Sequence, residues 1–138
     1  MRHDVLVRAS LAGTVVFVVV AAAATLAPDA LAVPTVVVDV VLAAAGCVAF
    51  VLTLLRAAER SRREAVTLPG IWWLSGSAPA PVRRALLGAF AVQVVVALAS
   101  ASIRPFTALA FGILVPVYGL GLAGLWAAHH GTFPPRAS

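Results

Sequence analysis

Four long apolar segments, separated by shorter polar ones, dominate the hydropathy pattern of the chain. They cover residues 9–27, 36–55, 85–103 and 106–128. Each is about 20 residues long, the length that a helix needs to cross the roughly 30 Å hydrocarbon layer of a bilayer. Lipid offers no partners for backbone N–H and C=O groups, so spans of this kind form helices rather than open strands. The pattern therefore predicts an all-α integral membrane protein with a single transmembrane domain.

The polar connections group these spans into two antiparallel hairpins. Pro28 and Pro34 punctuate a short turn between the first two spans, and only Arg104 and Pro105 separate the last two. A loop over residues 56–84 joins the hairpins. An even number of spans places both chain ends and this loop on the same side of the membrane.

Composition supports this class of protein. The chain of 138 residues is 62% hydrophobic and 11% charged, whereas a soluble domain is about 45–50% apolar and about 25% charged. So short a chain cannot bury that much apolar surface in a core of its own. Its net charge of +5 would suggest nucleic acid in a soluble protein. Here the basic residues flank apolar runs, so we expect anionic lipid headgroups as partners and no nucleic acid.

The arginines predict the orientation. Cytoplasmic loops carry the excess of Lys and Arg, and only Arg104 falls on the side opposite the chain ends. We therefore expect a multi-pass protein of the cell membrane with both termini cytoplasmic. The nine arginines on the predicted cytoplasmic side are Arg2, Arg8, Arg56, Arg60, Arg62, Arg63, Arg83, Arg84 and Arg136.

A secretory signal peptide is the alternative for the first span. Arg2 and Arg8, the apolar run and the small residues Ala30-Leu31-Ala32 fit such a peptide and its cleavage site. The run over residues 9–27 is longer than the usual apolar region of a signal peptide, which favours a retained span. Cleavage would leave three spans in the same orientation.

Four polar residues in or beside the spans are candidate functional residues. Counting from Arg104 at 1.5 Å per residue puts Gln93 and Tyr118 within about 4–5 Å in depth, so we expect them to meet across the second hairpin. Asp39 lies near the outer face, where pairing with Arg104 is geometrically reasonable. An intramembrane acid suggests proton or cation binding by default, whereas a Gln93–Tyr118 bond is better explained as structural glue.

The fourth span carries a stripe of small residues at helical spacing. Gly112, Gly119, Ala123 and Ala127 define a face that allows close helix packing. Pro116 interrupts this span, and we expect it to kink the helix and to release the carbonyl of Gly112.

The predicted cytoplasmic loop offers two further features. Arg60, Arg62 and Arg63 form a basic run, either a solvated face or a contact for anionic headgroups. Trp72 and Trp73 suit the headgroup level of the membrane, and an anchor for a partner protein is the alternative.

Residues that could carry enzymatic chemistry are scarce. The sequence contains no phosphate-binding loop, zinc-protease motif, nucleophile elbow or CxxC pair. His129 and His130 lack a third ligand, so we expect no metal, no cofactor and no enzymatic activity. Cys47 stands alone in an apolar run, where a packing role is expected.

Two families bear on the interpretation. The small multidrug exporters also have four spans, but they carry a glutamate in the first span, and this chain has no acid over residues 9–27. A second resemblance rests on three stretches, Arg104-Pro105-Phe106-Thr107, Gly119-Leu120-Gly121-Leu122 and the ending His130-Gly131-Thr132-Phe133-Pro134-Pro135-Arg136. Over this last quarter the chain resembles a group of small actinobacterial four-helix membrane proteins, and the resemblance implies location and no activity.

These observations favour a non-enzymatic accessory or scaffold protein that packs laterally with a larger membrane complex or with itself. The alternative is a small transporter or permease component that uses Asp39, Gln93 and Tyr118.

Overall fold

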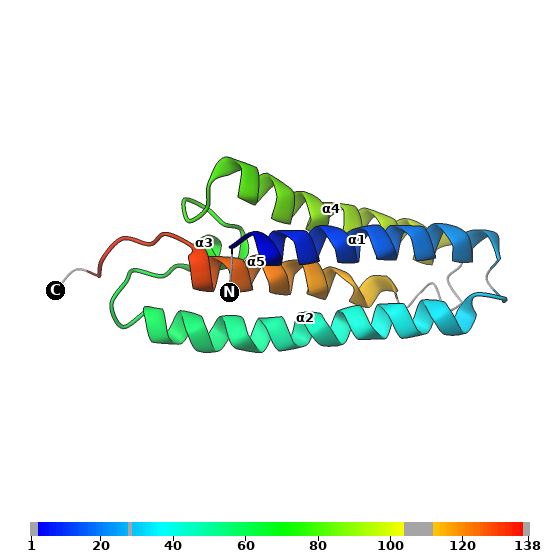
Figure 1. Ribbon diagram of the computed structural model, residues 1–138, viewed down its shortest axis with the longest axis horizontal. Helices are drawn as coiled ribbons and strands as arrows, with labels where there is room; N and C mark the ends of the chain where they lie inside the picture. Colours follow the sequence, from blue (N-terminus) through cyan, green and yellow to red (C-terminus); the bar gives the residue numbers. More distant parts are fainter. Residues whose placement is uncertain (1–2, 28, 104–111, 137–138) are drawn as a thin grey trace.

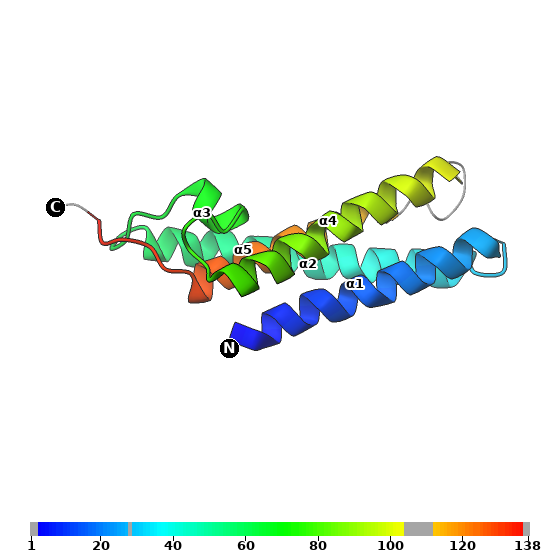
Figure 2. The same ribbon diagram turned by 90° about the horizontal axis from the view of Figure 1, so that it is seen from above.

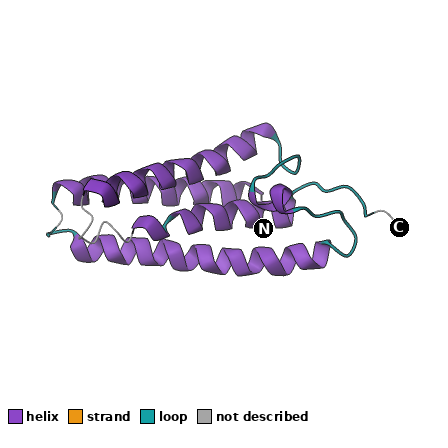
Figure 3. Ribbon diagram, turned by 180° about the vertical axis from the view of Figure 1, so that it is seen from behind, coloured by secondary structure: helices purple, strands orange, loops and turns teal. Residues whose placement is uncertain are grey.

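The computed structural model describes residues 3–27, 29–103 and 112–136, and Figures 1 and 3 show helices and loops with no strand in these ranges. Glu64 and Pro135 form an isolated antiparallel bridge. The helices are α1 (His3–Leu26), α2 (Ala32–Arg60), α3 (Leu68–Trp72), α4 (Ala80–Ile103) and α5 (Pro116–His130).

Four helical segments among the described residues are long and apolar enough to cross a membrane. They are Val5–Leu26, Ala32–Arg60, Ala80–Ile103 and Gly112–His130. The all-α fold is thus confirmed, and each expected span has a helical counterpart; the first part of the fourth span, residues 106–111, lies outside the described residues. α2 has 29 residues, about 43 Å at 1.5 Å per residue, so it is longer than the roughly 30 Å thickness of a hydrocarbon layer.

The described ends of the chain lie at the same end of the bundle, together with the connection between α2 and α4 (Figure 1). The turn between α1 and α2 lies at the opposite end (Figures 1 and 2). For brevity we call the first of these the terminal end and the second the turn end.

α5 is the central helix of the bundle. It contacts α1, α2, α3 and α4, and its contact with α2 is the most extensive. Every residue from Tyr118 to Ala128 except Leu120 is buried. The other long helices instead bury one narrow stripe each and leave their valines and leucines facing outward. This is expected in lipid, where apolar side chains gain nothing from burial and small residues allow close packing.

The buried stripes recur at spacings of three and four residues and hold many of the polar residues. α1 buries Leu6, Ser10, Gly13, Thr14, Phe17, Ala21 and Ala24, α2 buries Thr35, Asp39, Gly46, Ala49 and Thr53, and α4 buries Leu86, Ala89, Gln93, Ala97 and Ser100.

α2 and α5 approach closely because glycines face each other. A Cβ atom at Gly46 would lie 2.5 Å from the backbone nitrogen of Tyr118, and one at Gly121 would lie 2.5 Å from the carbonyl oxygen of Gly46. Both neighbours are backbone atoms, which cannot turn aside as a side chain would. The two helices therefore depend on the absence of side chains at these positions.

Pro116 begins α5 instead of kinking a longer helix, so the expected kink is wrong. Residues Gly112–Leu114 form a single 3₁₀ turn, and the Gly112 carbonyl accepts a hydrogen bond of 3.0 Å from the Val115 amide. Proline is well suited to the first helical position because its missing N–H would have no helical partner there. α5 itself has only 15 residues, about 22 Å, and is shorter than the hydrocarbon layer is thick.

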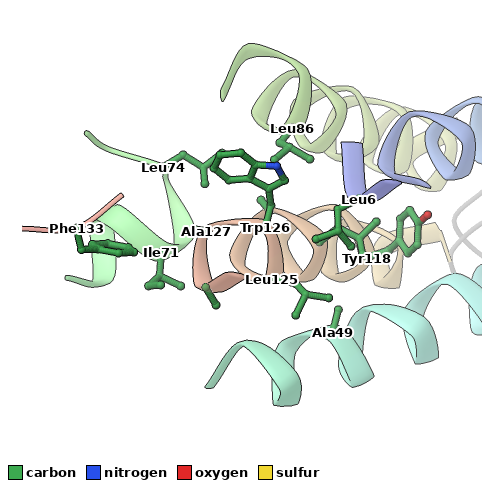
Figure 4. Packing of buried hydrophobic residues seen from close by; sticks show 13 residues of the cluster. Leu6, Ala49, Ile71, Leu74, Leu86, Tyr118, Leu125, Trp126, Ala127 and Phe133 are labelled. Atoms are coloured by element: carbon green, nitrogen blue, oxygen red, sulfur yellow. The ribbon is translucent and has the colours of Figure 1, made fainter. Parts of the chain in front are cut away.

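A cap built from α3 and the C-terminal tail covers the terminal end of α5. The Thr67 hydroxyl caps α3 by accepting a hydrogen bond of 3.1 Å from the Gly70 amide. The backbone then turns at Leu74, which has a positive φ of 55° and a fully buried side chain. Figure 4 shows Trp126 of α5 beside Leu74 and Leu86.

The tail is fastened to this cap through its backbone. Thr132 donates to the Ser77 carbonyl at 2.8 Å, and Pro134 accepts from the Ala65 amide at 2.8 Å. The Phe133 ring is buried against Gly70, at the left of Figure 4.

The glycine contact generates the first prediction. Gly46→Ala and Gly121→Ala should each lower the free energy of unfolding in detergent by about 1–3 kcal/mol, the usual range for overpacking. Gly88→Ala is the matched control, because no atom lies within 4 Å of a Cβ at Gly88, and removing a helix-interior glycine should raise stability by about 0.5–1 kcal/mol. Thermal unfolding measures all three, and equal effects at Gly46 and Gly88 would contradict the packing described.

Candidate functional site

Gln93 links three helices at the start of α5. Its side-chain nitrogen donates to the Thr14 hydroxyl at 2.7 Å, and its side-chain oxygen accepts from the Gly119 amide at 3.0 Å. Gly119 lies in the first turn of α5, where backbone N–H groups often lack helical partners. Gln93 of α4 therefore holds α1 through a side chain and α5 through its backbone.

The Tyr118 side chain bonds to α1 and not to Gln93, the partner that the sequence suggested. Its ring lies against Gly13, and its hydroxyl donates to the Ala9 carbonyl of α1. The expected hydrogen bond between Gln93 and Tyr118 is therefore wrong, although Gln93 does bond to the residue next to Tyr118. The depth estimate was adequate, but the two side chains point to different partners.

Asp39 and Thr35 stand one turn apart on the buried face of α2, towards the turn end. Each is 1% exposed, and neither carboxylate oxygen nor the Thr35 hydroxyl has a hydrogen-bond partner within the described ranges. A Cβ atom at Gly112 would lie 3.7 Å from a carboxylate oxygen of Asp39 and 3.2 Å from the Phe17 ring. Arg104, the partner expected for Asp39, lies outside the described residues.

The unpaired state of Thr35 differs from that of the other described threonines inside long helices. Thr14, Thr25 and Thr53 each donate to the carbonyl one turn earlier, at 2.7 Å. Such back-bonding is the common way for a helical hydroxyl to be satisfied in an apolar setting. The hydroxyl of Ser10 also lacks a partner in the part of the chain that the structure describes.

Arg60 closes the terminal end of α5. Its guanidinium donates to the carbonyls of Ala127 and Ala128 at 3.2 and 3.1 Å and to that of Gly131 at 2.8 Å. It also forms an ion pair of 2.5 Å with Glu64 and lies 5.0 Å from the centre of the Phe133 ring. A cation is favourable at a helix C-terminus because the last carbonyls are unsatisfied and the helix dipole is negative there.

The arginine run therefore divides into two kinds of residue. Arg60 is largely buried by the bundle, with 14% of its side chain exposed. Arg62 and Arg63 are exposed and remain the two members of the run that are open to contacts with headgroups.

The two tryptophans also differ. Trp72 stacks on Phe50 of α2 with ring centres 4.5 Å apart and fills the space left by Gly124. Trp73 is 52% exposed and meets Phe90 of α4 edge-on at 6.2 Å. Only Trp73 is placed to contact lipid or a partner freely.

The small-residue stripe of the fourth span faces the interior of this chain. Gly119 lies against Gln93, and Ala123 and Ala127 are fully buried. Gly112 is buried at the turn end. These residues pack this chain's own helices together and are not available to another protein. Conversely, Cys47 is exposed on the outward face of α2, so its expected packing role is wrong.

The described residues contain no group of three or more His, Cys, Asp or Glu side chains that could hold a metal ion. His129 contacts the Leu125 carbonyl at 3.2 Å, and the His130 ring lies 5.9 Å from that of Trp126. No family model matches the chain, and comparison with curated proteins and with solved structures gives no match.

Thr14, Phe133 and Thr35 are site residues that sequence reasoning missed. Thr35 could have been found from the spacing of four residues that places it on the same face of α2 as Asp39, and Thr14 from the three-and-four spacing that it shares with Ser10 and Phe17 on α1. Phe133 carried no such signal because it belongs to a segment without periodicity.

The Gln93 bonds generate the second prediction. Gln93→Leu should lower the free energy of unfolding by about 1–3 kcal/mol, because it leaves the Thr14 hydroxyl and the Gly119 amide with one partner fewer. Tyr118→Phe removes one bond and should cost about 0.6 kcal/mol. Thermal unfolding in detergent checks both against Val92→Leu, a neighbouring outward position that is 44% exposed. Unchanged stability in Gln93→Leu would show that these bonds do not hold the bundle together.

Proposed function

We propose that the chain is a non-enzymatic accessory or scaffold protein of the membrane, acting through lateral contacts with another transmembrane helix. One observation carries the proposal. Most of the buried polar side chains in the described bundle bond to other parts of this same chain, as Thr14, Gln93, Tyr118 and Thr53 do. The outward faces are therefore the surfaces with which the protein can act.

One of these faces has the form that a transmembrane helix needs. A groove of about 230 Å³ runs between α1 and α4 towards the turn end. Ala21, Ala22, Ala99 and Ser100 supply small side chains on both of its walls. The rest of the lining is Val18, Thr25, Val95, Val96 and Ile103. Small residues allow helix backbones to approach closely, which drives association in lipid. An apolar helix of a larger complex or of a second copy is thus the occupant that we propose.

The second candidate, a small transporter or permease component, retains less support. Of the three residues on which it rested, Gln93 and Tyr118 are bonded within the bundle. Asp39 is the one whose polar atoms have no partner in the described ranges, and it alone keeps this candidate open.

Placement in the membrane is part of the proposal. The first part of α1, the last part of α2, the first part of α4 and the C-terminal tail lie at the terminal end (Figure 1). These segments and the connection between α2 and α4 contain Arg8, Arg56, Arg62, Arg63, Arg83, Arg84 and Arg136, and this excess of arginine favours the cytoplasmic side. A polar hollow of about 330 Å³ at this end is lined by Arg56, Glu59, Arg60, Arg62, Arg63 and Glu64, and we infer that its exposed arginines face anionic headgroups. Each such arginine contributes about 1 kcal/mol near an anionic surface.

Lateral packing gives the third prediction. A photoreactive side chain introduced at Ala22 or Ala99, in the groove, should give a crosslinked adduct of one discrete protein mass in intact membranes. The same probe at Val41, which is 60% exposed on α2, is the matched control and should give no such adduct. Adducts with lipid alone at Ala22 and Ala99, or equal adducts at all three positions, would remove the support for this groove.

Orientation gives the fourth prediction. A fluorescent reporter that matures only in the cytoplasm should be bright when fused after Ser138, whereas an export-dependent phosphatase at the same place should be inactive. Insertion of the phosphatase beside Asp29, in the exposed turn between α1 and α2, should give the opposite result. An active phosphatase after Ser138 would reverse the orientation.

A further inference from the structure

The Asp39 carboxyl group presents an electrostatic problem that the rest of the bundle does not share. It is 1% exposed in an apolar segment, and an isolated ionised carboxylate in such surroundings is very costly. Three arrangements can relieve that cost: an opposite charge nearby, a bound metal cation, or a proton that makes the group neutral. The residues around Asp39 distinguish among them.

No described cation faces Asp39. α1 has no ionisable residue from Ala9 to its end, and neither does α4 from Ala85 to its end. On α2 the nearest titratable group is Cys47, which faces outward. α5 contributes Tyr118, whose hydroxyl is bonded to Ala9. Towards the turn end, Asp29 is exposed and of like charge. Arg104 lies outside the described residues.

Metal ligands are also too few in the described surroundings. Asp39 and Thr35 offer three side-chain oxygens between them, and the Phe17 ring and Gly112 lie near the Asp39 carboxylate. Calcium and magnesium take six or more oxygen ligands. A proton needs no further ligand, because it binds to the carboxylate itself.

We propose that Asp39 is held as a neutral carboxylic acid and is the proton-binding group of the bundle. The Thr35 hydroxyl, one turn earlier and free of the usual back-bond, is its polar neighbour on the same face of α2. The proposal goes beyond lateral packing and is independent of it, since it concerns the interior between α1, α2 and the start of the fourth span. Release of this proton would place an uncompensated charge beside Phe17 and Gly112.

Carbon-13 labelling of the aspartate carboxyl groups tests the proposal on the unmodified chain. The sequence has three aspartates, Asp4, Asp29 and Asp39, so a spectrum of the protein in lipid contains three side-chain carboxyl resonances. Near neutral pH we expect two at the chemical shift of an ionised carboxylate and one at that of a protonated acid. Asp39→Asn should remove the protonated resonance, whereas the matched control Asp29→Asn should remove an ionised one.

Arg104→Gln separates a proton from an ion pair. If Asp39 is neutral, its resonance in this variant stays where it is in the unmodified chain. Three ionised resonances in the unmodified chain would overturn the proposal. A shift of the Asp39 resonance to the protonated position only in Arg104→Gln would overturn it too, and would show that Arg104 holds the carboxylate ionised. The crosslinking result at Ala22 does not depend on the charge of Asp39, so the proposal on lateral packing and the proposal on Asp39 can fail independently.

Discussion

α5 can lie at the centre of the bundle because side chains of neighbouring helices form hydrogen bonds with the backbone groups at both of its ends. A helix that begins at Pro116 and ends at His130 is shorter than the hydrocarbon layer, so unsatisfied backbone groups at its ends are costly. Gln93 of α4 accepts from the amide of Gly119 at one end, and Arg60 of α2 donates to the last carbonyls at the other. The helices that surround α5 thus also complete its hydrogen bonding.

The hydrogen bonds to the backbone of α5 form only where the neighbouring helices pack closely against it, and glycines allow this close packing. Gln93 reaches the backbone of α5 because position 119 is a glycine, and Trp72 packs against the same helix because position 124 is a glycine. The facing glycines of α2 and α5, Gly46 and Gly121, bring Arg60 within reach of the α5 carbonyls. Hydrophobic association cannot supply this order in lipid, where the outward valines are already solvated.

The sequence predicted the four long apolar helices because bilayer thickness limits the length of an apolar run, but it did not predict the short helix α3. It did not predict which helix is central. Counting residues placed Gln93 and Tyr118 at similar depth, but depth does not give the direction of a side chain around the helix axis, and Tyr118 turned to Ala9. The contacts of Arg60 with Gly131 and Phe133 were beyond prediction because they join segments far apart in sequence through a tail without periodicity.

Two acidic side chains at the terminal end are paired with arginines, whereas Asp39 has no partner among the described residues. At the terminal end, Arg60 pairs with Glu64 and Arg56 pairs with Glu59 at 3.0 Å. Each of these two glutamates therefore has a cation beside it. Asp39 stands among an aromatic ring, a glycine and an unbonded threonine. The fold thus sets an opposite charge beside Glu59 and Glu64 and no described cation beside Asp39, so a charge on Asp39 would have to be accompanied by a change in its surroundings.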